Sequence, residues 1–226
     1  MMAFRPIAFA MLAWFGTVAC STTAFCLDFS KAPNEAEGEN AILASGKIEP
    51  DDAFRFQSYL SKLPQKPVTS LYLDSTGGRL QSAMAVGRIV HEAKIRTFVT
   101  GSAKCLSGCT NIFLAGRDRA TGGPYRVKGS ANSIGFHNFV PVLEDKQYGA
   151  KDAANAMAQA QRIIFELATY FQEIDADLEL LGLGLKQKEI YHLKNDEALR
   201  YGIHVLDSKT NDLVRHESYR RYIKPD

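Results

Sequence analysis

Three short segments carry residue types that could build a hydrolytic site. The first, residues 71–78 (LYLDSTGG), has the pattern of a strand that ends in Gly77 and Gly78 and is followed at once by a helix. Paired glycines allow a sharp turn and expose backbone N–H groups, which an anion or oxyanion site requires. Ordinary turn chemistry is the competing interpretation of a glycine pair in this position.

The second segment, residues 101–109 (GSAKCLSGC), also joins a strand to a helix. Ser107 at the helix start is either a plain N-cap or a nucleophile, because such a turn presents the hydroxyl while the Gly108 N–H points at a developing oxyanion. The third segment ends an apolar strand in His137, which is either a structural histidine or a general base. The remaining histidines have no partner motif: His91, His192, His204 and His216.

Strand and helix patterns alternate along the chain from residue 41. Apolar runs between Gly and Pro boundaries predict strands, and apolar spacings of three and four predict helices. The expected strands cover residues 42–45, 70–74, 95–99, 125–127 and 133–136, and the expected helices cover residues 51–63, 80–93, 107–115 and 151–174. This order of elements predicts an α/β domain of mainly parallel strands covered by helices.

The expected helix over residues 151–174 has one continuous apolar stripe. The stripe comprises Ala153, Met157, Ala160, Ile164, Leu167, Phe171 and Ile174. We expect it to pack on the protein's own sheet, and packing on a second subunit as well is an open alternative. After it, residues 197–203 (EALRYGI) indicate a short helix, a glycine stop and a final strand toward Asp207.

Taken in order, these segments resemble the Clp protease proteolytic subunit and its relatives, signal peptide peptidase A and the crotonases. Residues 74–78 (DSTGG) are similar to the family's Asn-Ser-Pro-Gly-Gly turn, and Ser107 and His137 match its nucleophile and base. The later motifs that match are residues 113–116 (FLAG), 197–198 (EA) and 201–202 (YG). The resemblance spans most of residues 42–207 and implies the ClpP/crotonase-like fold, with repeated strand-strand-helix units and a long helix after the histidine strand.

The resemblance also implies a mechanism. His137 would take the Ser107 proton during attack on a carbonyl, while the amides of Gly78 and Gly108 hold the oxyanion. No cofactor is implied, and because the relatives form rings or trimers a homo-oligomer is expected. In register with the family's third catalytic residue, an aspartate, this chain has Ile190, so the acid is left open among Glu189, Asp175, Asp177 and Asp196.

The first residues have the layout of a secretory signal peptide: Arg5, an apolar stretch over residues 7–19 and small polar residues after it. That stretch is shorter than the roughly 20 residues a membrane-spanning helix needs. We expect a signal peptide over residues 1–24, cleavage after Ala24, and export to the periplasm or medium. A lipid anchor at Cys20 is the alternative, and membrane association would require that anchor or a retained leader.

The remaining boundaries follow from composition. Residues 25–40 are rich in Glu, Asn and Gly and short of apolar periodicity, so a flexible connector is expected there. The folded domain is expected over residues 41–210, followed by a C-terminal tail over residues 211–226.

Cys105 and Cys109 bracket Ser107 at positions where the family has small residues. They are either two small buried side chains or, because export allows oxidation, a disulfide across the turn. We predict that the disulfide forms and stiffens the turn. No combination of His, Cys and carboxylate residues has convincing metal spacing.

The chain has 226 residues, of which 46% are hydrophobic, which suits one globular domain. Lys and Arg total 27 against 25 Asp and Glu, so no basic field favours nucleic acid. The sequence predicts an exported serine hydrolase, peptidase-like, that acts on short or unfolded chains, because an ATP-driven unfoldase has no ATP outside the cytosol. A catalytically silent binding or assembly module is the alternative, and export disfavours acyl-CoA chemistry.

Overall fold

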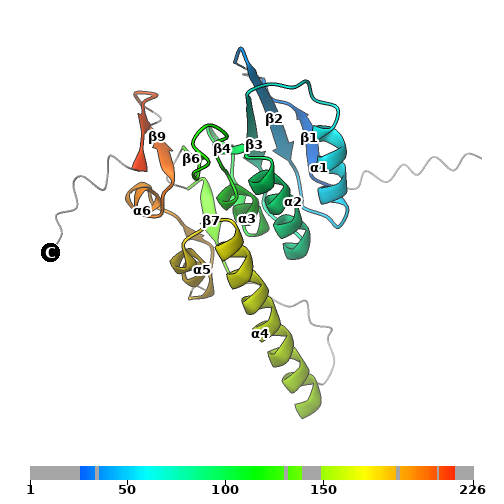
Figure 1. Ribbon diagram of the computed structural model, residues 1–226. Helices are drawn as coiled ribbons and strands as arrows, with labels where there is room; N and C mark the ends of the chain where they lie inside the picture. Colours follow the sequence, from blue (N-terminus) through cyan, green and yellow to red (C-terminus); the bar gives the residue numbers. More distant parts are fainter. Residues whose placement is uncertain are drawn as a thin grey trace, which may run out of the picture.

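The computed structural model shows a mixed α/β protein (Figure 1). The residues it describes are 26–33, 36–129, 132–138, 149–186, 189–207 and 209–216. The expected leader, including Cys20, and most of the expected C-terminal tail lie outside the described residues.

A seven-stranded sheet forms the centre of the fold, in the order β1-β2-β3-β4-β6-β9-β10. Neighbouring strands from β2 to β9 run parallel, and the two edge strands pair antiparallel. The strands are β1 (Asp28–Lys31), β2 (Glu39–Ser45), β3 (Val68–Asp74), β4 (Arg96–Val99), β6 (Arg126–Lys128), β9 (His204–Leu206) and β10 (Leu213–Val214). The mostly parallel sheet predicted from the alternating pattern is therefore confirmed.

A second, three-stranded sheet stands beside the first and carries two of the candidate site segments. It contains β5 (Cys105–Leu106), β7 (Ile134–Phe136) and β8 (Tyr191–His192). Strands β5 and β7 run parallel, with Cys105 opposite Ile134 and Leu106 opposite Gly135. The carboxyl ends of these two strands therefore lie side by side.

Six helices accompany the sheets in the described residues, and four of them lie where the apolar spacing predicts. They are α1 (Asp52–Leu60), α2 (Leu80–Glu92), α3 (Gly108–Leu114), α4 (Ala150–Glu173), α5 (Leu178–Leu185) and α6 (Asn195–Arg200). Helix α5 has no counterpart in the expected elements. Its sequence, LELLGLGL, is apolar on nearly every side and shows no clear helical period.

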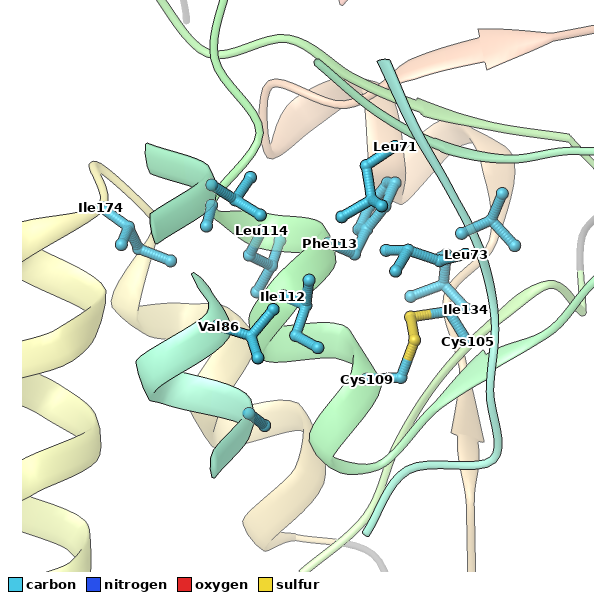
Figure 2. Close-up of a cluster of buried hydrophobic side chains, with 14 of the residues drawn as sticks. Leu71, Leu73, Val86, Cys105, Cys109, Ile112, Phe113, Leu114, Ile134 and Ile174 are labelled. Atoms are coloured by element: carbon cyan, nitrogen blue, oxygen red, sulfur yellow. A yellow bond between two sulfur atoms is a disulfide. The ribbon is translucent and has the colours of Figure 1, made fainter. Parts of the chain in front are cut away.

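The core lies between the central sheet and helices α2 and α3 (Figure 2). Every residue of α3 is buried, and its Ile112, Phe113 and Leu114 gather with Leu71 and Leu73 of β3. A helix buried on all sides holds its first turn in a fixed position, because neither end can move without opening the core.

The expectation for the stripe on α4 is wrong for the amino-terminal half of the helix. Leu167 and Phe171 are buried, as expected, but Met157 is 65% exposed and Ile164 is 38% exposed. Figure 1 shows the reason: the helix is longer than the body it packs on, and its first half projects beyond the sheets.

The expected connector over residues 25–40 is also partly wrong. Asp28–Lys31 form strand β1, which pairs antiparallel with β2 at the sheet edge. Leu27 is fully buried, and the Phe29 ring stacks on Phe56 of α1 with 4.9 Å between ring centroids. The apolar alternation of Leu27 and Phe29 was too short to stand out beside the polar residues that follow. At the other end, β10 extends the sheet past residue 210.

Candidate active site

The turn after β3 needs both of its glycines. Gly77 has φ 97°, and a Cβ added to it would lie 2.7 Å from the Ser107 Cβ. Gly78 has φ 151°, and a Cβ there would lie 2.2 Å from the Ile48 carbonyl oxygen. Only glycine permits both the backbone conformation and the approach, so this turn lies directly against the Ser107 turn.

Ser107 occupies a strained turn between β5 and α3. Its backbone has φ 54° and ψ −129°, a conformation that costs a residue with a Cβ about 1–3 kcal/mol. Its N–H donates to the Gly135 carbonyl (2.9 Å), and the Thr110 N–H and hydroxyl both donate to its carbonyl (3.0 and 2.6 Å). These bonds hold the strained turn in place.

The N-cap interpretation of Ser107 is wrong. The residue stands at the N-cap position of α3, yet its side chain makes no capping hydrogen bond. A serine kept in a costly conformation with an uncommitted hydroxyl is the arrangement found in nucleophile turns.

His137 follows β7 at the same edge of the small sheet as Ser107 follows β5. Its Nδ1 contacts the Asn138 carbonyl oxygen, and the backbone of Gly184 in α5 lies against its main chain. Because a carbonyl oxygen can only accept, Nδ1 carries the proton and Nε2 is left as the acceptor. This is the tautomer a general base needs.

The two predicted oxyanion glycines are neighbours. A Cβ on Gly108 would lie 3.3 Å from the Gly78 carbonyl oxygen and 3.5 Å from the Gly78 nitrogen. The Gly108 N–H is the first of α3 and has no intrahelical acceptor. Both backbones thus lie within reach of a common point beside Ser107.

One pocket of about 100 Å³ joins these residues. Ser107, His137, Gly78 and Gly108 all line it, so the structure brings the four predicted site residues together. Most of the remaining wall is apolar and comes from α2, β7, α4 and α5. The other lining residues are Leu80, Thr110, Asn111, Phe136, Leu167, Phe171, Leu180, Leu181, Gly184 and Leu185.

Neither of the first two candidates for a third catalytic acid is free to serve. Asp175 forms an ion pair with Arg117 (2.6 Å), and Asp177 accepts the Glu179 N–H (2.9 Å) as the N-cap of α5. Each carboxylate therefore has a structural task at the corner between α4 and α5.

The other two candidates also have no contact with His137. Asp196 lies near Lys128. Burial lowers the pKa of Lys128 to about 8, and the Asp196 carboxylate acts in the opposite direction. Glu189 is exposed. Ile190, in register with the family's acid, lies beside Gly135 of β7. Within the described ranges, no carboxylate forms a hydrogen bond with the His137 ring.

The predicted disulfide is confirmed. Cys105 and Cys109 are bonded and fully buried, and Figure 2 shows their sulfur atoms among Leu73, Ile112 and Ile134. The bond links the end of β5 to the first turn of α3. It therefore closes a covalent loop around Ser107.

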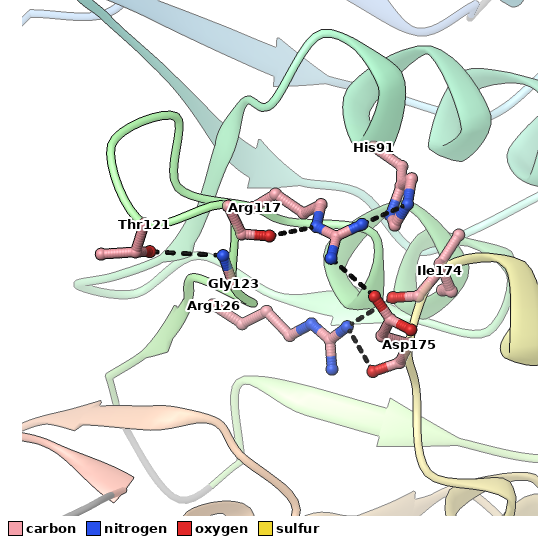
Figure 3. Close-up of polar contacts among 8 residues, drawn as sticks. His91, Arg117, Thr121, Gly123, Arg126, Ile174 and Asp175 are labelled. Carbon is pink, nitrogen blue, oxygen red and sulfur yellow. Dashed lines mark hydrogen bonds and ion pairs between the residues drawn. The ribbon is translucent and has the colours of Figure 1, made fainter.

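A polar network fixes the corner that follows α4 (Figure 3). The corner leads into α5, whose leucines line the pocket. Arg117 donates to the carbonyl of Gly122 and contacts the His91 Nε2 (2.7 Å) as well as Asp175. The buried Arg126 donates to the carbonyls of Ile174 and Asp175 (2.9 and 3.1 Å). Burial lowers the pKa of Arg126 to about 10, so it stays charged at neutral pH.

The sequence interpretation missed two contributors to the pocket. Helix α5 supplies three leucines, which its featureless apolar run did not reveal. Asn111 was treated as part of the α3 continuation, although its spacing of four residues from Ser107 could have indicated the same helix face.

Comparison with known proteins finds similarity among solved structures alone. No family model and no curated protein matches the chain. A solved structure described as a serine-to-alanine mutant of the 1510-N membrane-bound stomatin-specific protease is similar at 19% identity and a TM-score of 0.49. The match covers 73% of this chain and 77% of that one.

The described residues contain no helix with the length and apolar content to cross a bilayer. They also contain no group of three or more His, Cys, Asp or Glu residues arranged to bind a metal ion.

Proposed function

We propose that this chain is an exported serine hydrolase of the ClpP/crotonase-like fold, peptidase-like in its chemistry. Ser107 is the nucleophile, His137 the general base, and the amides of Gly78 and Gly108 form the oxyanion hole. The substrate is a peptide or an unfolded protein segment that reaches the pocket without an ATP-driven partner.

One observation carries the proposal: Ser107 is held at φ 54°, its hydroxyl makes no hydrogen bond to the residues that the structure describes, and it lies in a pocket that His137, Gly78 and Gly108 also line. Structural serines have no need of this conformation, and its cost is met by hydrogen bonds from Thr110 and to Gly135.

The mechanism follows from the hydrogen-bond roles. His137 Nε2 accepts the Ser107 proton as the oxygen attacks a carbonyl carbon, and the imidazolium then protonates the leaving amine. The Asn138 carbonyl, in place of a carboxylate, holds the Nδ1 proton and fixes the ring. Each oxyanion amide contributes roughly 3 kcal/mol to the barrier reduction. A neutral carbonyl stabilises an imidazolium less than a carboxylate does, so we expect slow turnover.

A fluorophosphonate probe tests the proposal. The full chain should be labelled at Ser107, with labelling lost in Ser107→Ala and retained in Ser102→Ala, which changes an exposed serine in the preceding loop. His137→Ala should slow labelling by orders of magnitude. Absence of labelling in folded protein, both oxidised and reduced, would overturn the proposal.

A catalytically silent binding module is the second candidate, and one observation favours it. In the part of the chain that the structure describes, the Ser107 hydroxyl makes no hydrogen bond to His137, and no carboxylate supports the ring. Under this alternative the probe gives no labelling, while peptides still bind the apolar pocket.

Export is part of the same proposal. It rests on the sequence of residues 1–24, in which Arg5, an apolar stretch over residues 7–19 and the small polar residues after it have the layout of a signal peptide. We expect protein recovered from the periplasm or medium to begin at Phe25. Amino-terminal sequencing that reads Met1 on all the protein would contradict export with cleavage.

A further inference from the structure

Asn111 is a buried polar residue in the apolar pocket that has no structural partner for its side chain. The residue is 6% exposed and lines the pocket together with Leu167 and Phe171 of α4. Its backbone carbonyl accepts the Tyr170 hydroxyl (2.7 Å). Its side-chain amide makes no hydrogen bond with any described residue.

The amide faces the pocket space. Among the described residues, only His91 Nδ1 and Arg126 Nε are both unpaired and sealed from solvent. The Asn111 amide atoms therefore reach accessible volume, and the accessible volume beside Asn111 is the pocket. A ligand that fills the pocket shields this amide from water and must either pair with it or leave it unsatisfied.

The position of Asn111 sets which part of a ligand it meets. It lies in α3, four residues after Ser107, and both residues line the same pocket. Side chains on a helix lean toward its amino terminus, which here is the Ser107 end. The amide thus meets the side chain attached to the carbonyl that Ser107 attacks, while Leu80, Leu180 and Leu181 cover the flanks.

We propose that Asn111 selects substrates with a carboxamide side chain, Asn or Gln, on the acyl side of the scissile bond. This rests on the proposed hydrolase function. A carboxamide is the group that pairs reciprocally with another carboxamide, donating one N–H and accepting one. The leucine walls then cover the methylene groups of the substrate. An aliphatic side chain leaves Asn111 unpaired, and a carboxylate would enter an apolar pocket with its charge uncompensated.

The test compares isosteric substrates. Fluorogenic peptides identical except for Gln, Met, Asn or Leu at the acyl-side position are cleaved by the full chain. Wild type should show a kcat/KM for Gln over Met, and for Asn over Leu, greater by on the order of ten- to a hundredfold. Asn111→Leu should reverse this ratio while cleaving the Met and Leu peptides at least as fast as wild type. Asn111→Asp keeps the shape but removes the donor, and should lose the preference as well.

Asn40→Leu is the matched control. Asn40 is buried to the same degree (5% exposed) and donates to the Pro64 carbonyl (2.9 Å), away from the pocket. This variant should lower the melting temperature and leave the substrate ranking unchanged.

Fluorophosphonate labelling of Ser107 separates the two levels of failure. Labelled wild type that cleaves Gln and Met peptides equally, or whose ratio is unchanged in both Asn111 variants, overturns the assignment of Asn111 and leaves the hydrolase intact. Wild type that is not labelled overturns the hydrolase and the assignment with it.

Discussion

At the scale of single residues, Ser107 has a backbone conformation that is unfavourable for a residue with a Cβ. A positive φ at a residue with a Cβ is tolerated only where the surroundings enforce it. Gly77 leaves space for the Ser107 side chain, because any side chain at position 77 would overlap the Ser107 Cβ. Function and stability therefore favour different residues at position 107.

The energetic cost of this conformation can be measured with two substitutions. Ser107→Gly removes the Cβ and its strain, whereas Ser107→Ala keeps both. We expect the glycine variant to have a free energy of unfolding about 1 kcal/mol higher than the alanine variant. Chemical denaturation measures the difference, and both variants should lose probe labelling. Equal stability of the two would show that the turn is unstrained.

At the scale of elements, the disulfide between β5 and α3 stabilises the turn that contains Ser107. The two cysteines that it joins also pack in the core beside Ile112 and Ile134. The turn is therefore held both by packing and by a covalent bond. A short closed loop gives a modest entropic gain.

Replacing the disulfide cysteines by alanine should lower the free energy of unfolding by about 2 kcal/mol and slow probe labelling of Ser107. Thermal and chemical unfolding, followed with and without reductant, measure the first effect. Cys26→Ala is the control, because Cys26 forms no disulfide: it loses only the contact that Arg55 donates to its sulfur (2.7 Å) and should leave probe labelling and the effect of reductant unchanged. Unchanged labelling in the cysteine-free turn would mean that packing alone holds Ser107.

The corner network predicts a second effect at this scale, a loss of stability in acid. Burial, and then the charge of Arg117, lower the pKa of His91, so the folded protein favours the neutral ring that accepts from Arg117. Between the usual histidine pKa of about 6.5 and the lower folded value, the unfolded chain binds more protons, and stability falls as pH decreases. Below the folded value this loss is complete.

Two glutamine variants isolate the contribution of His91. His91→Gln keeps an acceptor for Arg117 without a titrating group, and should reduce the fall in stability below pH about 6.5. His192→Gln, at an exposed position, should leave the curve unchanged. An identical pH dependence in wild type and His91→Gln would contradict the role of this contact.

At the scale of the whole molecule, the projecting half of α4 is largely exposed and has no apolar partner among the described residues. Helices without tertiary contacts are marginally stable in water. This one exposes Met157 and Ile164 of the stripe that enters the core at Leu167, and it exposes Phe165 beside that stripe. We predict that this half packs against a second copy of the chain. The second copy would then also cover the part of α4 that lines the pocket.

Light scattering should find wild type self-associated, and Met157→Glu combined with Phe165→Glu should yield monomers. Phe54→Glu changes an equally exposed aromatic on α1 (75% exposed) and should leave the association unchanged. Wild type that is monomeric at high concentration would contradict the prediction.

Local pattern was sufficient for much of this protein. Strands β2, β3, β4, β6 and β7 and helices α1 to α4 lie close to their expected ranges, because their apolar spacing and Gly or Pro boundaries act over a few residues. Gly78, Ser107 and His137 were singled out by the resemblance of the ordered motifs to a known family, because each motif alone left a structural interpretation open. The pairing of Cys105 with Cys109 followed from their closeness in the chain.

Tertiary structure alone decided the rest. Whether α4 is covered along its length depends on the size of the body it packs on, which no spacing within the helix records. The ion pair of Asp175 with Arg117 at the α4–α5 corner and the place of Asn111 in a pocket lined by α4 and α5 are set by neighbours distant in sequence. Apolar periodicity encodes which residues are buried, but the direction of a polar side chain depends on partners that meet only in the folded chain.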